Sequence, residues 1–274
     1  VHESALAAGA ITSEDIWTRI RLVLQHNQVS LAKSIAKHLP RRQTLDAKAL
    51  DAAAANPRTY LSRNGGIPDA RGGREIALFA LQRLGRTAPQ DAAARLRALS
   101  AELSAAEREL VWGQLAYYGA LLHDPEAAAW FARAGALDDG QLAWRARVAL
   151  RSQQWTELLD AIDAMSEAGR AEPEWRYWKA RAFRVQGRTA EANALLAPLS
   201  TEPAFYGLPA AEELGEAIGT PGEGYRPAEG EIQAVAAMPS IRRALALYRL
   251  GLRFEANPGR LWSIGEFDDR RIVA

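Results

Sequence analysis

Two stretches of the sequence decide the fold: WRARVALRSQQWTELLDAI at residues 144–162 and WKARAFRVQGRTAEANALL at residues 178–196. Their first residues, Trp144 and Trp178, are 34 positions apart. Apolar residues recur in both stretches at helical spacing, and Gly187 supplies a tight turn in the second. The sequence therefore predicts two successive helical hairpins. At this offset the stretches share Trp144/Trp178, Ala146/Ala180, Arg147/Arg181 and Glu157/Glu191.

The rest of the chain continues the helical pattern. No clear alternating run of Val, Ile and Thr lies between turn residues, so strands are not expected. Ser104 and Glu107 have the spacing of a capping box, and Gly215 is placed to end a helix. We predict an all-α fold. The predicted helices begin at 13 and at 208, and span 29–39, 45–55, 75–84, 91–99, 104–122, 126–134, 141–151, 155–165, 174–186, 189–199, 232–237 and 240–250.

A 34-residue period of helix pairs is typical of tetratricopeptide-like repeats. Each hairpin leaves an apolar face that only the next hairpin can cover, so the hairpins stack into a solenoid, an α-α superhelix with a concave face. The stretch GTPGEGYRPAEG at 219–230 is rich in Gly and Pro and interrupts the helices. We therefore predict a superhelical domain at 1–219, a linker at 220–230 and a second helical part at 231–274.

The composition is that of a globular protein and argues against several classes. The 274 residues are 48% hydrophobic, and 34 Lys plus Arg against 33 Asp plus Glu give a net charge of +1. This balance argues against nucleic acid as a partner, and the absence of cysteine excludes disulfides and thiolate chemistry. No apolar run is long enough for a membrane span, and VHESALAAGA at 1–10 is no signal peptide. Both ends read as parts of helices, so we expect a piece of a longer chain.

No set of residues predicts catalysis, a cofactor or a metal. The histidines, at 2, 26, 38 and 123, lack zinc-ligand spacing, and the glycine pairs at 65–66 and 72–73 follow no strand that would make them a phosphate-binding loop. The acidic pairs at 138–139 and 268–269 are placed to stabilise helix N-termini, and Glu212-Glu213 is expected on a solvated helix face. We predict no catalytic, cofactor-binding or metal-binding residue and assign no substrate-binding residue.

Aromatic and arginine side chains are the remaining candidates for binding. We expect the aromatic residues to form the core between hairpins, with one or two exposed members free to line a groove for sugar rings. We expect the arginines to lie on solvated helix faces, with a positively charged lining for an anionic polymer as the alternative. The aromatic residues are Trp112, Tyr117, Tyr118, Trp130, Phe131, Trp144, Trp155, Trp175, Tyr177 and Trp178, and the arginines are Arg41, Arg42, Arg145, Arg147, Arg181, Arg184, Arg242 and Arg243.

Two motifs resemble the late part of the U-domain of soluble lytic murein transglycosylases. The first is WRYWKARA at 175–182, followed by the turn at Gly187, and the second is FYGLPAAEELG at 205–215. The stretches at 16–40, 71–86 and 103–112 are similar to the same domain, and MPSIRRALALYRLGLRFEA at 238–256 is similar to the start of the family's linker domain. The resemblance covers nearly the whole chain.

This resemblance implies a ring-like superhelical U-domain at 1–219 and a truncated linker domain at 231–274. It implies a periplasmic protein, without a cofactor, that holds peptidoglycan strands. In the full-length protein this part would be joined to a catalytic domain of the same chain. Family members cleave the MurNAc–GlcNAc bond with a goose-lysozyme-like domain, whose acidic residue lies in a Glu-Ser motif followed by Gly-Leu-Met-Gln. Glu3-Ser4 matches the first motif alone, so no general acid is assigned. We expect a scaffold whose catalytic domain is missing from this chain, and which by itself is inactive and binds glycan strands weakly or only as part of the parent protein.

The 34-residue period alone supports a rival hypothesis, a tetratricopeptide-like adaptor that binds proteins or peptides. Two places depart from the family pattern: Pro209, which is tolerated only near the start of a helix, and PGRLWSIGEF at 258–267, where the linker-domain helix is expected to end early. We interpret Phe205-Tyr206-Gly207 as a packing anchor that closes the apolar end of the solenoid.

Overall fold

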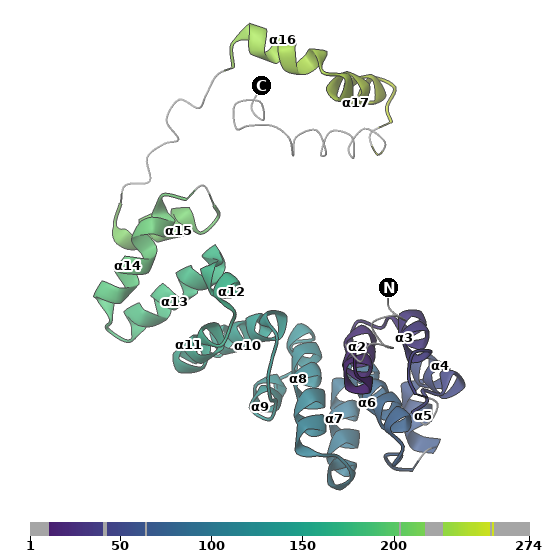
Figure 1. Cartoon of the computed structure of the whole chain (residues 1–274). Coiled ribbons are helices and arrows are strands. Elements are labelled where there is room, and N and C mark those ends of the chain that lie inside the picture. Colours follow the sequence, from purple (N-terminus) through teal and green to yellow (C-terminus); the bar gives the residue numbers. More distant parts are fainter. Residues whose placement is uncertain are drawn as a thin grey trace. The chain divides into compact units, whose positions relative to one another are not determined.

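The computed structural model describes residues 11–40, 43–63, 65–202, 204–216, 227–252 and 254. Within these residues every regular element is a helix, which confirms the predicted all-α class (Figure 1). The helices are α2 Ser13–Gln25, α3 Val29–Ala36, α4 Ala47–Ala55, α5 Pro57–Arg63, α6 Arg71–Gly85, α7 Pro89–Ala98, η1 Ser100–Glu102, α8 Ala105–Leu121, α9 Ala127–Phe131, α10 Asp139–Arg151, α11 Trp155–Asp163, α12 Glu167–Ala171, α13 Pro173–Val185, α14 Thr189–Ser200, α15 Gly207–Leu214, α16 Glu229–Ala237 and α17 Pro239–Arg249.

The chain divides into two compact units, Val1–Gly215 and Glu216–Ala274. Helices α2 to α15 belong to the first unit, and α16 and α17 to the second. Residues 220–226 of the predicted linker lie outside the described residues, and its last two residues are helical because α16 begins at Glu229. The identification of 1–219 as a U-domain and of 231–274 as the start of a linker domain stays a prediction.

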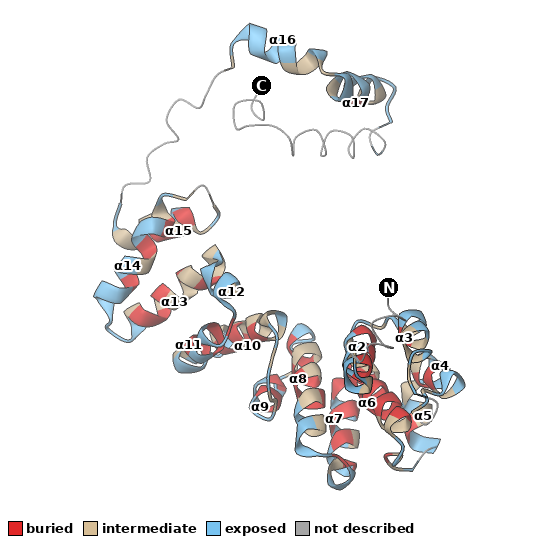
Figure 2. Ribbon diagram, in the orientation of Figure 1, coloured by how far each residue is buried: buried red, intermediate tan, exposed pale blue. Residues whose placement is uncertain are grey.

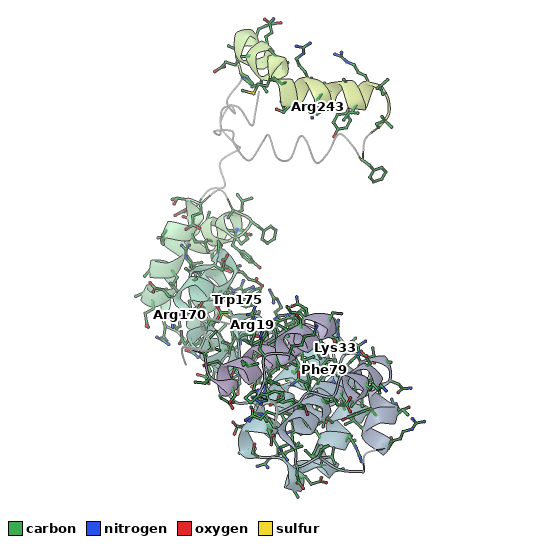
Figure 3. The ribbon with its side chains drawn as sticks, turned by 45° about the vertical axis from the view of Figure 1, so that its right-hand side comes forward. Arg19, Lys33, Phe79, Arg170, Trp175 and Arg243 are labelled. Atoms are coloured by element: carbon green, nitrogen blue, oxygen red, sulfur yellow. The ribbon has the colours of Figure 1, made fainter. Side chains whose placement is uncertain are left out.

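Helices of the first unit pack mainly against their neighbours in the chain. The closest pairs include α8 with α9, α10 with α11 and α13 with α14. Buried side chains form two clusters. The first extends from α2 to α10 and includes Phe79, and the second extends from α10 to α15 and includes Trp175. Figure 3 labels these two residues. Figure 2 shows buried faces turned toward neighbouring helices and exposed faces turned away. The apolar face of one hairpin is thus covered by the next, as a solenoid requires.

The two repeated hairpins make equivalent contacts. Both shared alanines are fully buried, where a small side chain lets neighbouring helices approach closely. Arg147 on α10 binds Glu174 on α13 at 3.0 Å, and its counterpart Arg181 on α13 binds Glu213 on α15 at 2.6 Å. Each arginine therefore binds a helix beyond its own hairpin. The shared alanine and the shared arginine both contribute to packing between successive helices.

Helix starts follow local sequence signals. The hydroxyl of Ser104 accepts a hydrogen bond from the backbone N–H of Glu107 at 3.3 Å, and the Glu107 carboxylate accepts one from the Ser104 N–H at 2.8 Å. This reciprocal pair confirms the predicted capping box of α8. At α2 the cap is Thr12, one residue before the predicted Ser13, and it forms a capping box with Asp15.

Several helix boundaries differ from the prediction. Helices α5 and α12 are not predicted at all, and α5 begins at Pro57, two residues after the end of the predicted helix 45–55. Proline fits that position because the first helical N–H has no partner within the helix. Helix α6 begins at Arg71, four residues early, since packing overrides the low helix propensity of its glycines. The predicted helices 29–39 and 126–134 each end three residues early.

The Phe205-Tyr206-Gly207 triplet is not the anchor that the sequence predicts. Phe205 is 80% exposed, so that part of the interpretation is wrong. Tyr206 is half-buried, with its ring 5.3 Å from that of Tyr177. Gly207 is buried at the first position of α15. Only the second and third residues of the triplet therefore pack against α13 and the end of α14.

We expect Gly207→Ala to lower the free energy of unfolding by about 2 kcal/mol. A Cβ atom at this position would lie 2.3 Å from the carbonyl oxygen of Glu202 and 3.2 Å from that of Leu199, and backbone atoms cannot rotate away. Urea unfolding of both variants measures the effect. The matched control is Gly140→Ala in α10, where the nearest atom is the flexible carboxylate of Asp138 at 3.2 Å. The control is expected to be neutral or up to about 1 kcal/mol more stable, and equal losses in the two variants would contradict the packing described.

The second unit is described for α16, α17 and the residues next to them. Most of their side chains are exposed, including Arg242 and Arg243, and Ala244 is buried. Across all described residues of the chain, none of the helices combines the length and the apolar character needed to cross a bilayer.

Candidate functional site

A groove of about 710 Å³ lies where the ends of several helices of the first unit meet. We call it the tyrosine groove. Helix α8 supplies its central wall, the segments that follow α2 and α6 supply one side, and the start of α10 supplies another. The groove thus combines residues more than a hundred positions apart in the sequence. Its lining residues are Gln25, His26, Asn27, Arg86, Gln114, Tyr117, Tyr118, Leu121, Asp138, Gly140 and Gln141.

Helix periodicity explains which side chains of α8 face the groove. Gln114, Tyr117, Tyr118 and Leu121 are spaced three, four and seven residues apart, so they form one stripe on the helix. A second stripe runs from Ala105 to Trp112, and each of its residues lies nine positions before a residue of the first stripe. Nine residues are about two and a half helical turns, so the second stripe lies on the opposite face of α8. That second stripe lines a separate hollow. Helix α8 therefore carries two different polar and aromatic surfaces.

The tyrosine groove offers aromatic faces beside amide groups. Tyr117 and Tyr118 are half-buried, and their rings lie edge to face at 5.4 Å. The guanidinium of Arg86 lies 5.7 Å from the centre of the Tyr118 ring. The amide of Gln141 donates a hydrogen bond to that of Gln114 at 3.5 Å, the outer limit for such a bond. Aromatic rings beside amides can contact the apolar and polar parts of a sugar ring, so this surface suits an N-acetylated sugar.

The sequence predicts that most aromatic residues form the core and leaves one or two exposed members free to line a groove, without saying which. Tyr117 and Tyr118 are the pair that does so in the tyrosine groove. By contrast, Trp112, Trp130 and Trp175 are buried in the core. The stripe on α8 was visible in the sequence. What could not be seen was that the ends of α2 and α6 and the start of α10 enclose it.

The acidic pairs of the sequence have structural partners. Asp138 caps α10, accepting a hydrogen bond from the backbone N–H of Gln141 at 2.8 Å, as expected for an acid at a helix start. Hydrogen bonds from the hydroxyl and backbone N–H of Ser166 lower the pKa of Asp139. Glu3 and the acidic pair 268–269 lie outside the described residues.

The sequence predicts that Glu213 lies on a solvated helix face, and this prediction is wrong. Its carboxylate binds Arg181 at 2.6 Å and Arg184 at 3.2 Å, and its side chain is 20% exposed. These two arginines and Arg147 therefore form contacts between hairpins and do not cover a free basic face. Glu212 is exposed, as expected.

The three histidines in the described residues, His26, His38 and His123, do not come together. His26 lines the tyrosine groove and His38 lines a different hollow beside α2 and α3, while His123 is exposed in the turn after α8. Among the described residues, no group of three or more His, Asp or Glu side chains is arranged to hold a metal ion. His2 lies outside the described part of the chain.

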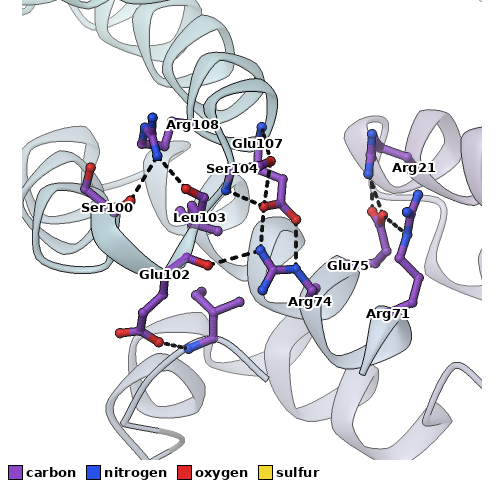
Figure 4. Close-up of polar contacts among 11 residues, drawn as sticks. Arg21, Arg71, Arg74, Glu75, Ser100, Glu102, Leu103, Ser104, Glu107 and Arg108 are labelled. Carbon is purple, nitrogen blue, oxygen red and sulfur yellow. Dashed lines mark hydrogen bonds and ion pairs between the residues drawn. The ribbon is translucent and has the colours of Figure 1, made fainter. Parts of the chain in front are cut away.

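Two buried or partly buried glutamates bind arginines on neighbouring helices (Figure 4). Glu75 on α6 accepts a hydrogen bond from Arg21 on α2 at 3.0 Å and lies 2.9 Å from the Nε atom of Arg71. Glu107 on α8 accepts a hydrogen bond from Arg74 on α6 at 3.0 Å. A general acid must release a proton near neutral pH. Partial burial raises the pKa of Glu107, but hydrogen bonds from Arg74 and Ser104 outweigh it and lower the pKa from 4.5 to about 2. Glu107 is therefore ionised at neutral pH and ties helices together.

The low pKa of Glu107 predicts acid sensitivity. Its contribution to stability is fully present above the ordinary pKa of 4.5 and is lost as the pH falls toward the folded-state value of about 2. We expect a loss of about 2–3 kcal/mol across that window. Urea unfolding between pH 6 and pH 2 should give a flatter profile for Glu107→Gln than for the wild type. Glu157→Gln, at an exposed glutamate, serves as the control and should keep the wild-type profile. Identical profiles for both variants would refute this role of Glu107.

The sequence is related to known enzymes of the bacterial cell wall. No model of a protein family matches the chain. It is 27% identical over 217 residues to the soluble lytic murein transglycosylase of Escherichia coli, covering 72% of this chain and 32% of that protein. The enzyme of Salmonella typhimurium is 25% identical over 223 residues with the same coverage. The chain thus spans about a third of the length of the curated relatives it matches.

The fold is similar to those of solved lytic transglycosylases. An inactive mutant of the lytic transglycosylase Slt from Pseudomonas aeruginosa matches with a TM-score of 0.65 and 24% identity, over 99% of this chain and 45% of that one. The 70-kDa soluble lytic transglycosylase from Escherichia coli matches with a TM-score of 0.62 and 22% identity, over 99% and 44%. These matches confirm the predicted all-α superhelical fold. The predicted resemblance is confirmed as well: the chain is homologous to the soluble lytic murein transglycosylases across 72% of its length, in a part that makes up 32% of theirs.

Proposed function

We propose that this chain is the superhelical, non-catalytic scaffold of a periplasmic soluble lytic transglycosylase and that it positions peptidoglycan strands. The observation that carries the proposal is the tyrosine groove, a sugar-sized surface of tyrosine rings and amides on a solenoid homologous to these enzymes. In this role the two tyrosines stack on the apolar faces of the sugar rings. The amides of Gln114 and Gln141 bind the N-acetyl groups, exchanging their long mutual contact for shorter ones with the ligand.

The chain's own residues bind and orient the strand and do not cleave it. Cleavage of the MurNAc–GlcNAc bond with formation of a 1,6-anhydro ring needs an acid that protonates the leaving oxygen while the sugar's own 6-hydroxyl attacks. The two glutamates held by arginines, Glu75 and Glu107, are unsuited to that step because each already neutralises a neighbouring cation. We assign the reaction to a catalytic domain of the parent protein, which is the second partner of this chain.

Sedimentation with purified sacculi tests the proposal. The pure chain is expected to pellet with sacculi and to leave their turbidity unchanged. Loss of turbidity would refute the non-catalytic role. Absence of binding, together with recovery of a soluble peptide ligand, would instead support the adaptor hypothesis.

A further inference from the structure

A second hollow, of about 650 Å³, lies on the opposite face of α8 from the tyrosine groove. We call it the arginine pocket. It is enclosed by the end of α7, by η1, by the first half of α8 and by the residues after α9. Its lining includes three arginines, Arg97, Arg108 and Arg133, one glutamate, Glu109, and the ring of Trp112.

The charges of the arginine pocket are unbalanced. Arg97 binds Glu126 at 2.9 Å. Arg108 donates hydrogen bonds to the carbonyl oxygens of Ser100 and Leu103, which are neutral (Figure 4). Arg133 makes no hydrogen bond or ion pair with any side chain in the part of the chain that the structure describes. The three arginines thus face two carboxylates, that of Glu109 in the lining and that of Glu126 on Arg97, which leaves one positive charge unbalanced.

Two of these cations lie against the ring of Trp112. The guanidinium carbon of Arg97 lies 5.6 Å from the centre of its ring and that of Arg133 lies 5.1 Å away, within the range of cation–π attraction. Trp112 is itself fixed, since it is 6% exposed and its ring lies 6.3 Å from that of the buried Trp130. Both guanidinium groups line the arginine pocket, and Glu126 already neutralises that of Arg97, so Arg133 is the cation left to attract an anion.

We propose that the arginine pocket binds a carboxylate of murein. A carboxylate matches the planar fork of a guanidinium and can accept two parallel hydrogen bonds from it, and Arg133 has its donors available. The choice of murein rests on the proposed function. Murein carries carboxylates in two places, the lactyl group of MurNAc and the attached peptide. The pocket would therefore recognise the charged parts of a strand, while the tyrosine groove contacts its neutral sugar rings.

Calorimetric titration of the chain with four probes tests the site. The probes are a peptide-free murein oligosaccharide, whose lactyl carboxylates are free, the isolated murein peptide, a chitin oligosaccharide without carboxylates, and inorganic phosphate. We expect one of the two carboxylate probes to bind, and which one binds identifies the source. Arg133→Gln should weaken that binding roughly tenfold, the effect of one charge-assisted hydrogen bond. The control Arg63→Gln removes an exposed arginine on α5, outside the pocket, and should leave the affinity unchanged.

Three results would overturn the carboxylate site: no binding of either carboxylate probe, unchanged affinity in Arg133→Gln, or displacement of the carboxylate by equimolar phosphate. The chitin oligosaccharide separates this proposal from the preceding one. If chitin binds and Arg133→Gln has no effect, the carboxylate site fails and the scaffold function stands. If the isolated peptide binds through Arg133 and no glycan binds, the site stands and the scaffold function fails.

Discussion

Replacement of Trp130 by alanine is expected to lower the free energy of unfolding by about 3–5 kcal/mol, the usual range for removing a buried aromatic side chain. Trp130 is fully buried, and its indole N–H donates a hydrogen bond to Glu126 at 3.1 Å. Its ring lies against Gly119 on α8, where a Cβ atom would come within 2.7 Å. Helix α9 has only five residues, too few to be stable alone, so its position depends on this contact.

Urea unfolding of Trp130→Ala measures this loss, and Phe205→Ala is the matched control. Both variants remove one aromatic ring, but Phe205 is 80% exposed. The control is therefore expected to stay within about 0.5 kcal/mol of the wild type. A loss below about 1.5 kcal/mol for Trp130→Ala, or an equal loss in the control, would contradict the packing between α8 and α9.

The second large effect is expected for Glu75→Ala, a loss of about 2–3 kcal/mol. The Glu75 side chain is 2% exposed and lies between two arginines, Arg21 on α2 and Arg71 on α6 (Figure 4). Removing it leaves two cations facing each other without their shared partner. The side chains of these arginines are 33% and 38% exposed, so water offsets part of the full cost of breaking a buried pair.

Asp51→Ala is the control for this effect. Asp51 also binds a cation, Lys33, but its side chain is 59% exposed. Exposed ion pairs contribute about 0–1 kcal/mol, so the control should be nearly neutral in urea unfolding. Similar losses in the two variants would show that burial of Glu75 does not set its contribution.

Local and periodic features of the fold were predictable from the sequence. The capping box at Ser104 and the 34-residue repeat depend on residues close together or regularly spaced, so they can be read without tertiary contacts. Helix starts that depend on packing were less clear. Pro57 can follow the end of one helix or begin the next, and the sequence does not decide between the two. The glycines of α6 disfavour helix in isolation, but neighbouring helices hold that segment in helical form.

Contacts between hairpins could not be predicted. Glu213 looked like a solvated residue because its two arginines lie about thirty residues earlier, on α13. Phe205 looked like core because aromatic residues usually bury, yet only its neighbour Tyr206 reaches the ring of Tyr177. The tyrosine groove depends in the same way on residues from α2, α6, α8 and α10, whose meeting point is a property of the stacked solenoid.

The most direct test of the account is the affinity of the chain for peptide-free murein glycan strands, measured by calorimetry on wild type and Tyr117→Ala. We expect the wild type to bind and Tyr117→Ala to bind about tenfold more weakly, because it loses one stacking surface. Tyr117→Phe keeps the ring and Phe205→Ala removes a ring outside the groove, so both should bind like the wild type. No binding by the wild type, or equal affinity of Tyr117→Ala, would contradict the proposal that this solenoid positions glycan strands through the tyrosine groove.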